Sequence, residues 1–436
     1  MKNNMRILEL TESTRKNILE NLLKRSPSQY GQYEAAVNDI ITQIRERGDE
    51  ALLEYTERFD HCTLTPDTLE VTEEEIRQAY GALTPEFIEV LKKSAANIRA
   101  YHEKQLRNSW FDTKENGTIL GQKITPLQRV GVYVPGGTAA YPSSVLMNII
   151  PAKVAGVKEI VMTTPPGRDG SMNPATLVAA DIAGAAKIYK AGGAQAVAAL
   201  AFGTATIPKV DKITGPGNIF VALDKRSVFG YVSIDSIAGP SEILVLADET
   251  ANPRYVAADL LSQAEHDILA SAILITTSGT LAESVSAEID AFLQQLSRKE
   301  IMEQSLQNYG YILLAPDLDT AVETVNEIAS EHLEILTASP FEILPKIQNA
   351  GAIFLGEYSS EPLGDYFAGP NHVLPTNGTA KFFSPLGVDD FIKKSSVISY
   401  SKKALREVHK DIELFAGQEG LTAHANSIKV RFEAEA

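Results

Sequence analysis

Short apolar segments alternate with longer helix-like segments through the middle of the chain, and this alternation constrains the fold more than any other feature. One series begins at residue 129 and ends near residue 218, and a second runs from residue 242 to residue 355. Strands that alternate with helices of this length form parallel sheets covered by helices on both faces. The sequence therefore predicts an α/β protein with two parallel-sheet domains.

The expected elements follow from apolar periodicity, alanine content and glycine stops. In the first series we expect strands at 130–134, 159–163, 196–201 and 209–213, and helices at 144–156 and 175–190. In the second we expect strands at 242–246, 272–276, 311–314, 333–336 and 352–355, and helices at 255–266, 281–296 and 319–330. Residues before about 106 are expected to be helical, residues 364–385 to form loops, and residues 387–436 to mix strand and helix.

Charge and cysteine content exclude several classes of function. The chain has 40 Lys and Arg against 56 Asp and Glu, a net charge of −16, which argues against nucleic acid as the main partner because phosphate binding relies on basic side chains. No apolar run approaches the roughly 18 residues of a membrane span, and the start lacks a signal peptide's apolar core, so we expect a soluble, cytoplasmic protein. The single cysteine, Cys62, excludes an intramolecular disulfide framework and multi-thiolate zinc sites.

Two glycine turns follow predicted strands, at residues 135–137 (Pro-Gly-Gly) and 215–218 (Gly-Pro-Gly-Asn). In open α/β sheets, ligands lie outside the carboxyl ends of the strands. A dinucleotide cleft is one interpretation, although neither turn has the G-x-G-x-x-G pattern. Tight turns that need only glycine's backbone freedom are the other interpretation.

Gln263 and His266 lie three residues apart on a predicted helix, so their side chains would share a face. This separation lets two side chains reach one metal ion, but it also suits a polar pair on a solvated face. Asp365, in a glycine-rich loop, and His424, in the tail, are further candidate ligands. A zinc site without thiolates would use imidazole, carboxylate and carbonyl oxygen.

Glu331 and His332 are adjacent at the predicted end of a helix and precede an apolar strand. They are either a surface pair at a helix end, where a cationic histidine is favoured, or a general base and a water activator at the mouth of an α/β cleft. His372 could line a site but has no evident partner in the sequence.

Nine short motifs resemble the histidinol dehydrogenase family in their order and spacing, and the match extends from about residue 41 to residue 431. They span residues 131–137 (GVYVPGG), 191–196 (AGGAQA), 214–218 (TGPGN), 238–242 (AGPSE), 261–267 (LSQAEHD), 330–334 (SEHLE), 363–365 (LGD), 369–375 (GPNHVLP) and 420–424 (GLTAH). The resemblance implies a zinc-dependent enzyme of histidine biosynthesis. Such an enzyme oxidises L-histidinol through L-histidinaldehyde to L-histidine with two NAD.

The resemblance also assigns roles residue by residue. It implies one zinc per subunit on Gln263, His266, Asp365 and His424. It places NAD near Tyr133, Gln195 and Asn218, and the substrate on Ser241, His332 and Glu419 beside the metal ligands. Glu331 and His332 match the family's catalytic pair.

The family pattern further implies four domains and a homodimer. The expected parts are an N-terminal helical arm at 1–28; an α/β domain of 29–128 with 241–385 that carries the catalytic and zinc residues; an NAD-binding, Rossmann-like domain at 129–240; and a small C-terminal domain at 386–436. We expect this last domain to be swapped, so that each zinc site is completed by His424 of the other subunit. The sequence alone also allows a tail folded back on its own chain.

Cysteine content supports the implied chemistry independently. Many aldehyde-oxidising enzymes form a covalent intermediate on a cysteine, but Cys62 lies far from every motif. The second oxidation must then use a hydrated aldehyde and an activated water. We expect Glu331 to activate that water and His332 to remove the alcohol proton.

Two other functions remain open from the sequence. The first is oxidation of another amino alcohol or diol with the same zinc and NAD machinery. The second is a non-catalytic zinc-binding or nucleotide-binding protein built on the same fold. The tail residues Glu419 and His424 favour histidinol, and the presence of both Glu331 and His332 weighs against a non-catalytic protein.

Overall fold

The computed structural model describes residues 5–25, 31–136, 140–237 and 239–433. The chain forms two compact units, a main unit of Met1–Gln105 with Leu127–Phe391 and a tail unit of Leu106–Pro126 with Ile392–Ala436. From the sequence, residues 106–126 were expected in the α/β domain of 29–128 and 241–385. They belong to the tail unit instead, because their strands pair with a strand of the tail.

The first parallel sheet of the main unit has five strands in the order β6-β5-β4-β7-β8. They are β4 (Arg129–Tyr133), β5 (Glu159–Thr164), β6 (Lys187–Lys190), β7 (Lys212–Thr214) and β8 (Ser233–Ile234). The helices that pack with it are α2 (Glu34–Arg47), α3 (Asp49–Asp60), α5 (Glu73–Ala82), α6 (Pro85–Glu103), α7 (Pro142–Ala155), α8 (Pro174–Ala183), α9 (Gly193–Phe202) and α10 (Ile219–Val228). Alternate strand residues point to opposite faces, so two apolar cores form, one under α5–α8 and the other under α2, α3, α9 and α10.

This packing of α2, α3, α5 and α6 differs from the expected grouping of residues 29–128 with residues 241–385. An amphipathic helix shows which of its faces is buried, but it does not show which sheet it covers.

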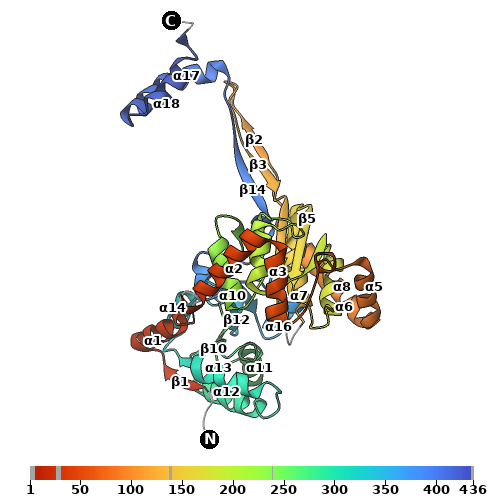
Figure 1. Ribbon diagram of the computed structural model, residues 1–436. Helices are drawn as coiled ribbons and strands as arrows, with labels where there is room; N and C mark the ends of the chain where they lie inside the picture. Colours follow the sequence, from red (N-terminus) through yellow and green to blue (C-terminus); the bar gives the residue numbers. More distant parts are fainter. Residues whose placement is uncertain (1–4, 26–30, 137–139, 238, 434–436) are drawn as a thin grey trace. The chain divides into compact units, whose positions relative to one another are not determined.

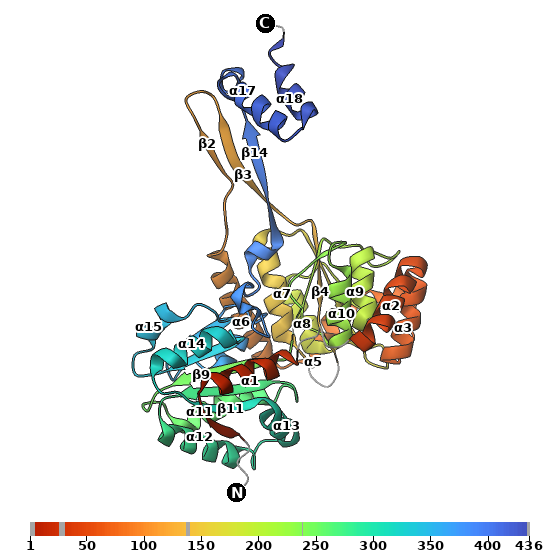
Figure 2. The same ribbon diagram turned by 90° about the vertical axis from the view of Figure 1, so that its left-hand side faces the viewer.

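The second parallel sheet has six strands in the order β1-β11-β10-β9-β12-β13. Figure 1 labels its strands β1, β10 and β12, and Figure 2 labels β9 and β11. The six strands are β1 (Arg6–Glu9), β9 (Glu242–Ala247), β10 (Ser271–Thr276), β11 (Gly310–Leu314), β12 (His332–Leu336) and β13 (Ala352–Leu355). Its helices are α1 (Glu12–Leu23), α11 (Pro253–Ala264), α12 (Gly279–Phe292), α13 (Lys299–Tyr309), α14 (Leu318–Ile328), α15 (Pro340–Ile343) and α16 (Glu361–Tyr366). A further short helix, α4 (Pro66–Leu69), follows α3 in the chain. Helices α11–α13 cover one face, and α1 and α14 cover the other.

The N-terminal segment was expected to be a helical arm, but it begins with β1, which adds a parallel strand beside β11. A strand of four residues between charged positions carries too little apolar pattern to be detected.

Two elements of the first series were predicted wrongly. Residues 175–190 form helix α8 and strand β6 rather than one helix, because Gly184 adopts a left-handed backbone (φ 91°) and ends α8. Residues 196–201 belong to helix α9 rather than to a strand. This helix is buried almost throughout, so it lacks a polar face, and its sequence does not show the helical spacing of apolar and polar residues.

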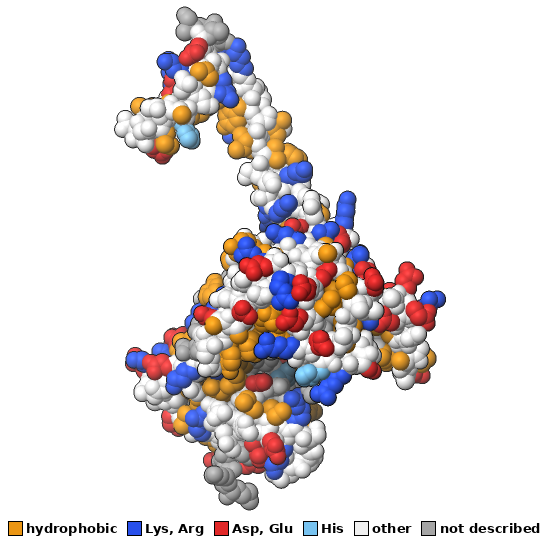
Figure 3. Space-filling view, viewed as in Figure 1, with side chains coloured by type: hydrophobic (Ala, Val, Ile, Leu, Met, Phe, Trp, Pro, Cys, Tyr) orange, Lys and Arg blue, Asp and Glu red, His pale blue; other side chains and the backbone are white. Residues whose placement is uncertain are grey.

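The tail unit pairs β14 (Ile392–Ser399), β3 (Ile119–Pro126) and β2 (Trp110–Thr113) in an antiparallel sheet and adds helices α17 (Lys402–Gln418) and α18 (Thr422–Lys429). Among its described residues, the buried apolar side chains are Ala404 and Ala416. Many apolar side chains of this unit lie on its surface instead (Figure 3). Across the described residues of both units, no helix is long and apolar enough to cross a membrane.

Candidate active site

A cavity of about 560 Å³ opens in the main unit where loops of both sheets meet. The predicted site residues that line it are Asn218, Ser241, Gln263, His266, Glu331, His332 and Asp365. In the first sheet, the glycine turns follow the carboxyl ends of β4 and β7, as expected. In the second sheet the cavity lies at the amino ends of the strands, because Ser241 precedes β9 and His332 begins β12.

The backbone between α14 and β12 positions Glu331 and His332. Helix α14 ends at Ile328, before the predicted end at residue 330, and Ala329 turns the chain with φ 53°. Gly351 on the neighbouring segment allows close approach, since a Cβ there would lie 2.4 Å from the carbonyl oxygen of Glu331. His332 thus enters the sheet between β9 and β13, rather than lying on a surface helix end.

The backbone of one residue, Glu242, holds both catalytic candidates. The backbone N–H of Glu242 donates to Glu331 Oε2 at 2.9 Å, and the Glu242 carbonyl oxygen lies 2.9 Å from His332 Nδ1. A carbonyl oxygen only accepts hydrogen bonds, so Nδ1 carries the proton and Nε2 of the neutral ring is free to act as a base. His332 Nε2 is buried and has no hydrogen-bond partner among the described residues.

Burial sets the protonation of this pair. It lowers the pKa of His332 to about 4, although the negative charge of Asp365 opposes that change. Burial also raises the pKa of Glu331 well above its usual range; the hydrogen bond from Glu242 opposes this, and the charges of Glu242 and Asp365 add to it. The site therefore holds a neutral imidazole beside a carboxyl group that binds its proton strongly.

Gln263 and His266 lie at the end of α11, which stops at Ala264 rather than at the predicted residue 266. Gln263 is buried, and its Oε1 has no hydrogen-bond partner among the described residues. Asp365, in α16, lines the same cavity. Three of the four predicted zinc ligands are therefore brought together within the main unit.

These residues fit a zinc ion. A buried polar atom without a partner, such as Gln263 Oε1, costs free energy and points to a missing ligand. The amide oxygen, imidazole and carboxylate present here are donors that zinc accepts. Burial alone would raise the pKa of Asp365, but the hydrogen bond and charge of His372 outweigh it and lower that pKa to about 2. Asp365 is therefore ionised and ready to bind a cation.

His424 and Glu419 belong to the tail unit. His424 lies near the start of α18, Glu419 follows the end of α17, and both are exposed. The roles predicted for these two residues at the site of the main unit stay predictions.

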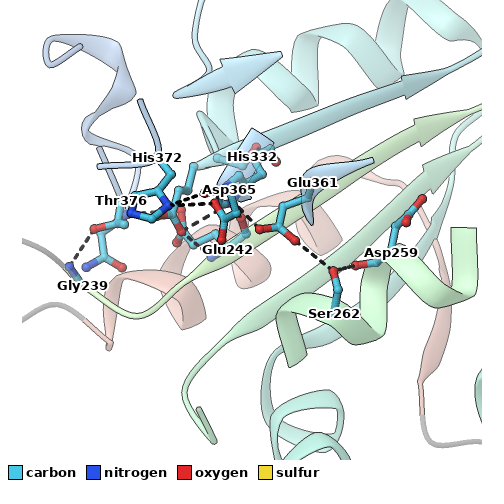
Figure 4. A network of polar contacts seen from close by, with 12 residues as sticks. Gly239, Glu242, Asp259, Ser262, His332, Glu361, Asp365, His372 and Thr376 are labelled. Carbon is cyan, nitrogen blue, oxygen red and sulfur yellow. Dashed lines mark hydrogen bonds and ion pairs between the residues drawn. The ribbon is translucent and has the colours of Figure 1, made fainter. Parts of the chain in front are cut away.

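Sequence reasoning missed Glu361. Ligand atoms of His332, Glu361 and Asp365 lie within 4.8 Å of one another (Figure 4), so this trio could also hold a metal ion. Burial and the charge of Asp365 raise the pKa of Glu361 to about 9. The four-residue spacing of Glu361 and Asp365, which places both on one face of α16, was the signal available in the sequence.

The structure also supplies the missing partner of His372. Its Nδ1 lies 3.5 Å from Asp365 Oδ1, and its Nε2 lies 3.2 Å from the hydroxyl of Ser144. His372 thus connects Ser144, on helix α7 of the first sheet, with the carboxylate of Asp365, and orients that carboxylate.

The predicted NAD residues differ in their access to the cavity. Asn218 lines it and caps α10 by accepting hydrogen bonds from the N–H groups of Phe220 and Val221. Tyr133, at the end of β4, accepts a hydrogen bond from Gly193 N at 3.2 Å and is buried. Gln195 is buried in α9, and its Nε2 has no partner among the described residues.

Close backbone packing explains Gly215 in the turn after β7. A Cβ at Gly215 (φ 117°) would lie 1.9 Å from the carbonyl oxygen of Tyr133. Gly137 and Ala238, which belong to two of the motifs, lie outside the described residues.

Comparison with known proteins points to the same family as the nine sequence motifs. A family model described as histidinol dehydrogenase matches residues 23–432. The histidinol dehydrogenase of Clostridium acetobutylicum is 57% identical over 433 residues, covering 99% of this chain and 100% of that protein. The histidinol dehydrogenase of Bacillus subtilis is 60% identical over 395 residues, covering 91% and 92%.

A solved structure agrees with the fold as well. The crystal structure of histidinol dehydrogenase from Elizabethkingia anophelis has a TM-score of 0.94 and 38% sequence identity, and the match covers 100% of this chain and 99% of that one. With the family model spanning both units, these matches show that the chain belongs to the histidinol dehydrogenase family, an oxidoreductase family of histidine biosynthesis.

Proposed function

We propose that this enzyme oxidises L-histidinol through L-histidinaldehyde to L-histidine, with two NAD as hydride acceptors and one zinc per subunit. The observation that carries the proposal is the buried pair Glu331 and His332. The backbone of Glu242 holds both side chains in a cavity that the ligand candidates and the glycine turns also line. When bound, zinc supplies a Lewis acid that holds and polarises the substrate, and NAD supplies the hydride acceptor.

His332 serves the first oxidation. Its free Nε2 takes the hydroxyl proton of histidinol as the carbinol carbon loses a hydride, which gives the aldehyde, NADH and one proton. Burial keeps the ring neutral, and the bond from Nδ1 to Glu242 fixes its orientation. A neutral ring with an oriented lone pair is the form in which histidine accepts a proton, and its lowered pKa makes it a weaker acceptor than an ordinary imidazole.

Glu331 serves the second oxidation. It takes a proton from water, the resulting hydroxide adds to the aldehyde, and the hydrate loses a second hydride to give the carboxylate. The raised pKa of Glu331 makes its ionised form a better proton acceptor than an ordinary carboxylate. No cysteine is needed for this path, and Cys62 is buried close to Gly170, away from the cavity lining.

The zinc would be held by Gln263, His266 and Asp365 of one subunit and by the tail's His424 of a second subunit in a homodimer. The composition of the tail unit supports the swap. It buries Ala404 and Ala416 but leaves Ile398 71%, Leu414 65% and Phe415 70% exposed. A unit with so little core requires a large surface to pack against.

Steady-state NADH formation tests the proposed function directly. We expect L-histidinol to be oxidised with a kcat/KM at least about 10²-fold above that of other amino alcohols and of polyols, because buried polar groups left unpaired by a wrong substrate are costly. A polyol that reacts faster would indicate a related dehydrogenase instead. No NADH from any substrate by the zinc-loaded protein would indicate a non-catalytic binding protein.

A further inference from the structure

Glu242 occupies a special place in the active site because its backbone binds both catalytic side chains. Its N–H holds Glu331 Oε2, and its carbonyl oxygen holds His332 Nδ1, each at 2.9 Å. A small displacement of the Glu242 backbone would therefore move the water activator and the alcohol base together.

The side chain of Glu242 anchors this stretch of backbone. It is 3% exposed and pairs with the guanidinium of Arg25, and its Oε2 accepts the backbone N–H of Asn377 at 3.2 Å. Burial raises the pKa of Glu242 and the charge of Arg25 opposes the rise, so the guanidinium favours the ionised, hydrogen-bonded carboxylate.

Arg25 reaches this position from the N-terminal segment, just after α1. It is 1% exposed although it lines the cavity. Its Nη1 donates to the carbonyl oxygen of Leu269 at 2.9 Å, and its Nε donates to that of Leu22 at 3.3 Å. Leu269 lies three residues after His266. One guanidinium therefore connects Glu242, whose backbone holds the catalytic pair, with the segment that carries a ligand candidate.

We infer that Arg25 is a positioning residue, which acts through the carboxylate of Glu242 to hold Glu331 and His332 in their working geometry. The expected change in kcat rests on the proposed function, whereas the expected change in the position of His332 does not depend on it. The planar fork of Arg25 reaches several acceptors at once, and the ammonium of a lysine does not reproduce that arrangement.

The test compares Arg25→Lys, which keeps the buried positive charge, with Arg15→Met as a matched control. Arg15 also lies in the N-terminal segment and pairs with Glu327 at 3.2 Å, but it does not contact Glu242. We expect Arg25→Lys to lower kcat of both half-reactions by about 10–100-fold per zinc-loaded site, because small misplacements of catalytic groups have effects of this size. KM for histidinol should change less than about threefold, and Arg15→Met should leave kcat unchanged.

A spectroscopic measurement separates this inference from the proposed function. In protein labelled with 15N-histidine, the His332 Nδ1–H signal, assigned by its absence from His332→Asn, should be present and slow to exchange in the wild type. It should broaden or move to Nε2 in Arg25→Lys but not in Arg15→Met. If the signal and kcat per site were both unchanged in Arg25→Lys, Arg25 would be a stabilising residue only. If the signal changed as expected while the wild type formed no NADH from histidinol, the proposed function would fail and the positioning role would stand.

If Arg25→Lys does not fold, the double variant Arg25→Met with Glu242→Gln replaces the buried ion pair by a neutral pair of similar size, which is often tolerated. It should fold, bind zinc and show the same loss in kcat and the same change in the His332 signal. Wild-type kcat in this double variant would overturn the inference.

Discussion

The substitution His332→Asn should slow the oxidation of histidinol by about 10²–10⁴-fold, because a positioned general base contributes a factor of this size. Asparagine can keep a hydrogen bond to the Glu242 carbonyl but offers no counterpart of Nε2. Glu331→Gln should instead slow the oxidation of histidinaldehyde more than that of histidinol, since only the second step needs an activated water. The two half-reactions are measured separately, with histidinol and with histidinaldehyde as the starting substrate.

Zinc content decides between the two arrangements of ligands around Asp365. Our assignment makes His332 a base and Glu331 a water activator, so both variants should bind zinc as the wild type does. Loss of zinc from His332→Asn would instead assign the ion to the trio of His332, Glu361 and Asp365. His61→Asn is the matched control, because His61 is exposed with a left-handed backbone (φ 55°) that asparagine tolerates.

Mixing two inactive variants should restore activity if the tail is swapped. His266→Ala removes a ligand from the main unit, and His424→Ala removes one from the tail. In a swapped mixed dimer, one site combines an intact main unit with an intact tail, while the other site lacks both ligands. With random pairing about half of the dimers are mixed, so activity should approach about a quarter of the wild-type value.

The same mixture distinguishes a tail that folds onto its own chain. In that arrangement every site lacks one ligand whatever the pairing, so no activity should return after subunit exchange. Mixing His266→Ala with a Gln263→Ala chain is the control, because both changes lie in the main unit and no pairing completes a site.

The central strands β9 and β10 of the second sheet were predictable because they are buried on both faces. Glu242–Ala247 and Ser271–Thr276 are buried at every position, and such strands form nearly continuous apolar runs. The same reasoning failed for α9, where a buried helix gives an equally continuous run. The edge strands β1 and β2 escaped detection because they are short and mostly exposed.

The site was predictable where a motif names a residue and unpredictable where a contact depends on the tertiary fold. Gln263, His266, Asp365, Glu331 and His332 were all expected, and the cavity brings them together. The interaction of Arg25 with Glu242 joins residues 217 positions apart. Glu242 ends one of the family motifs, but no local pattern marks Arg25 or pairs it with Glu242. The tautomer of His332 likewise depends on the carbonyl of a neighbouring strand.

In the proposed reaction one site carries out both oxidations, and the number of NADH formed for each histidinol consumed measures this. With limiting histidinol and excess NAD, an enzyme that keeps the aldehyde bound should form two NADH for each histidinol consumed, and an aldehyde trap in solution should capture almost none. Formation of one NADH for each histidinol, with free histidinaldehyde accumulating, would contradict the account.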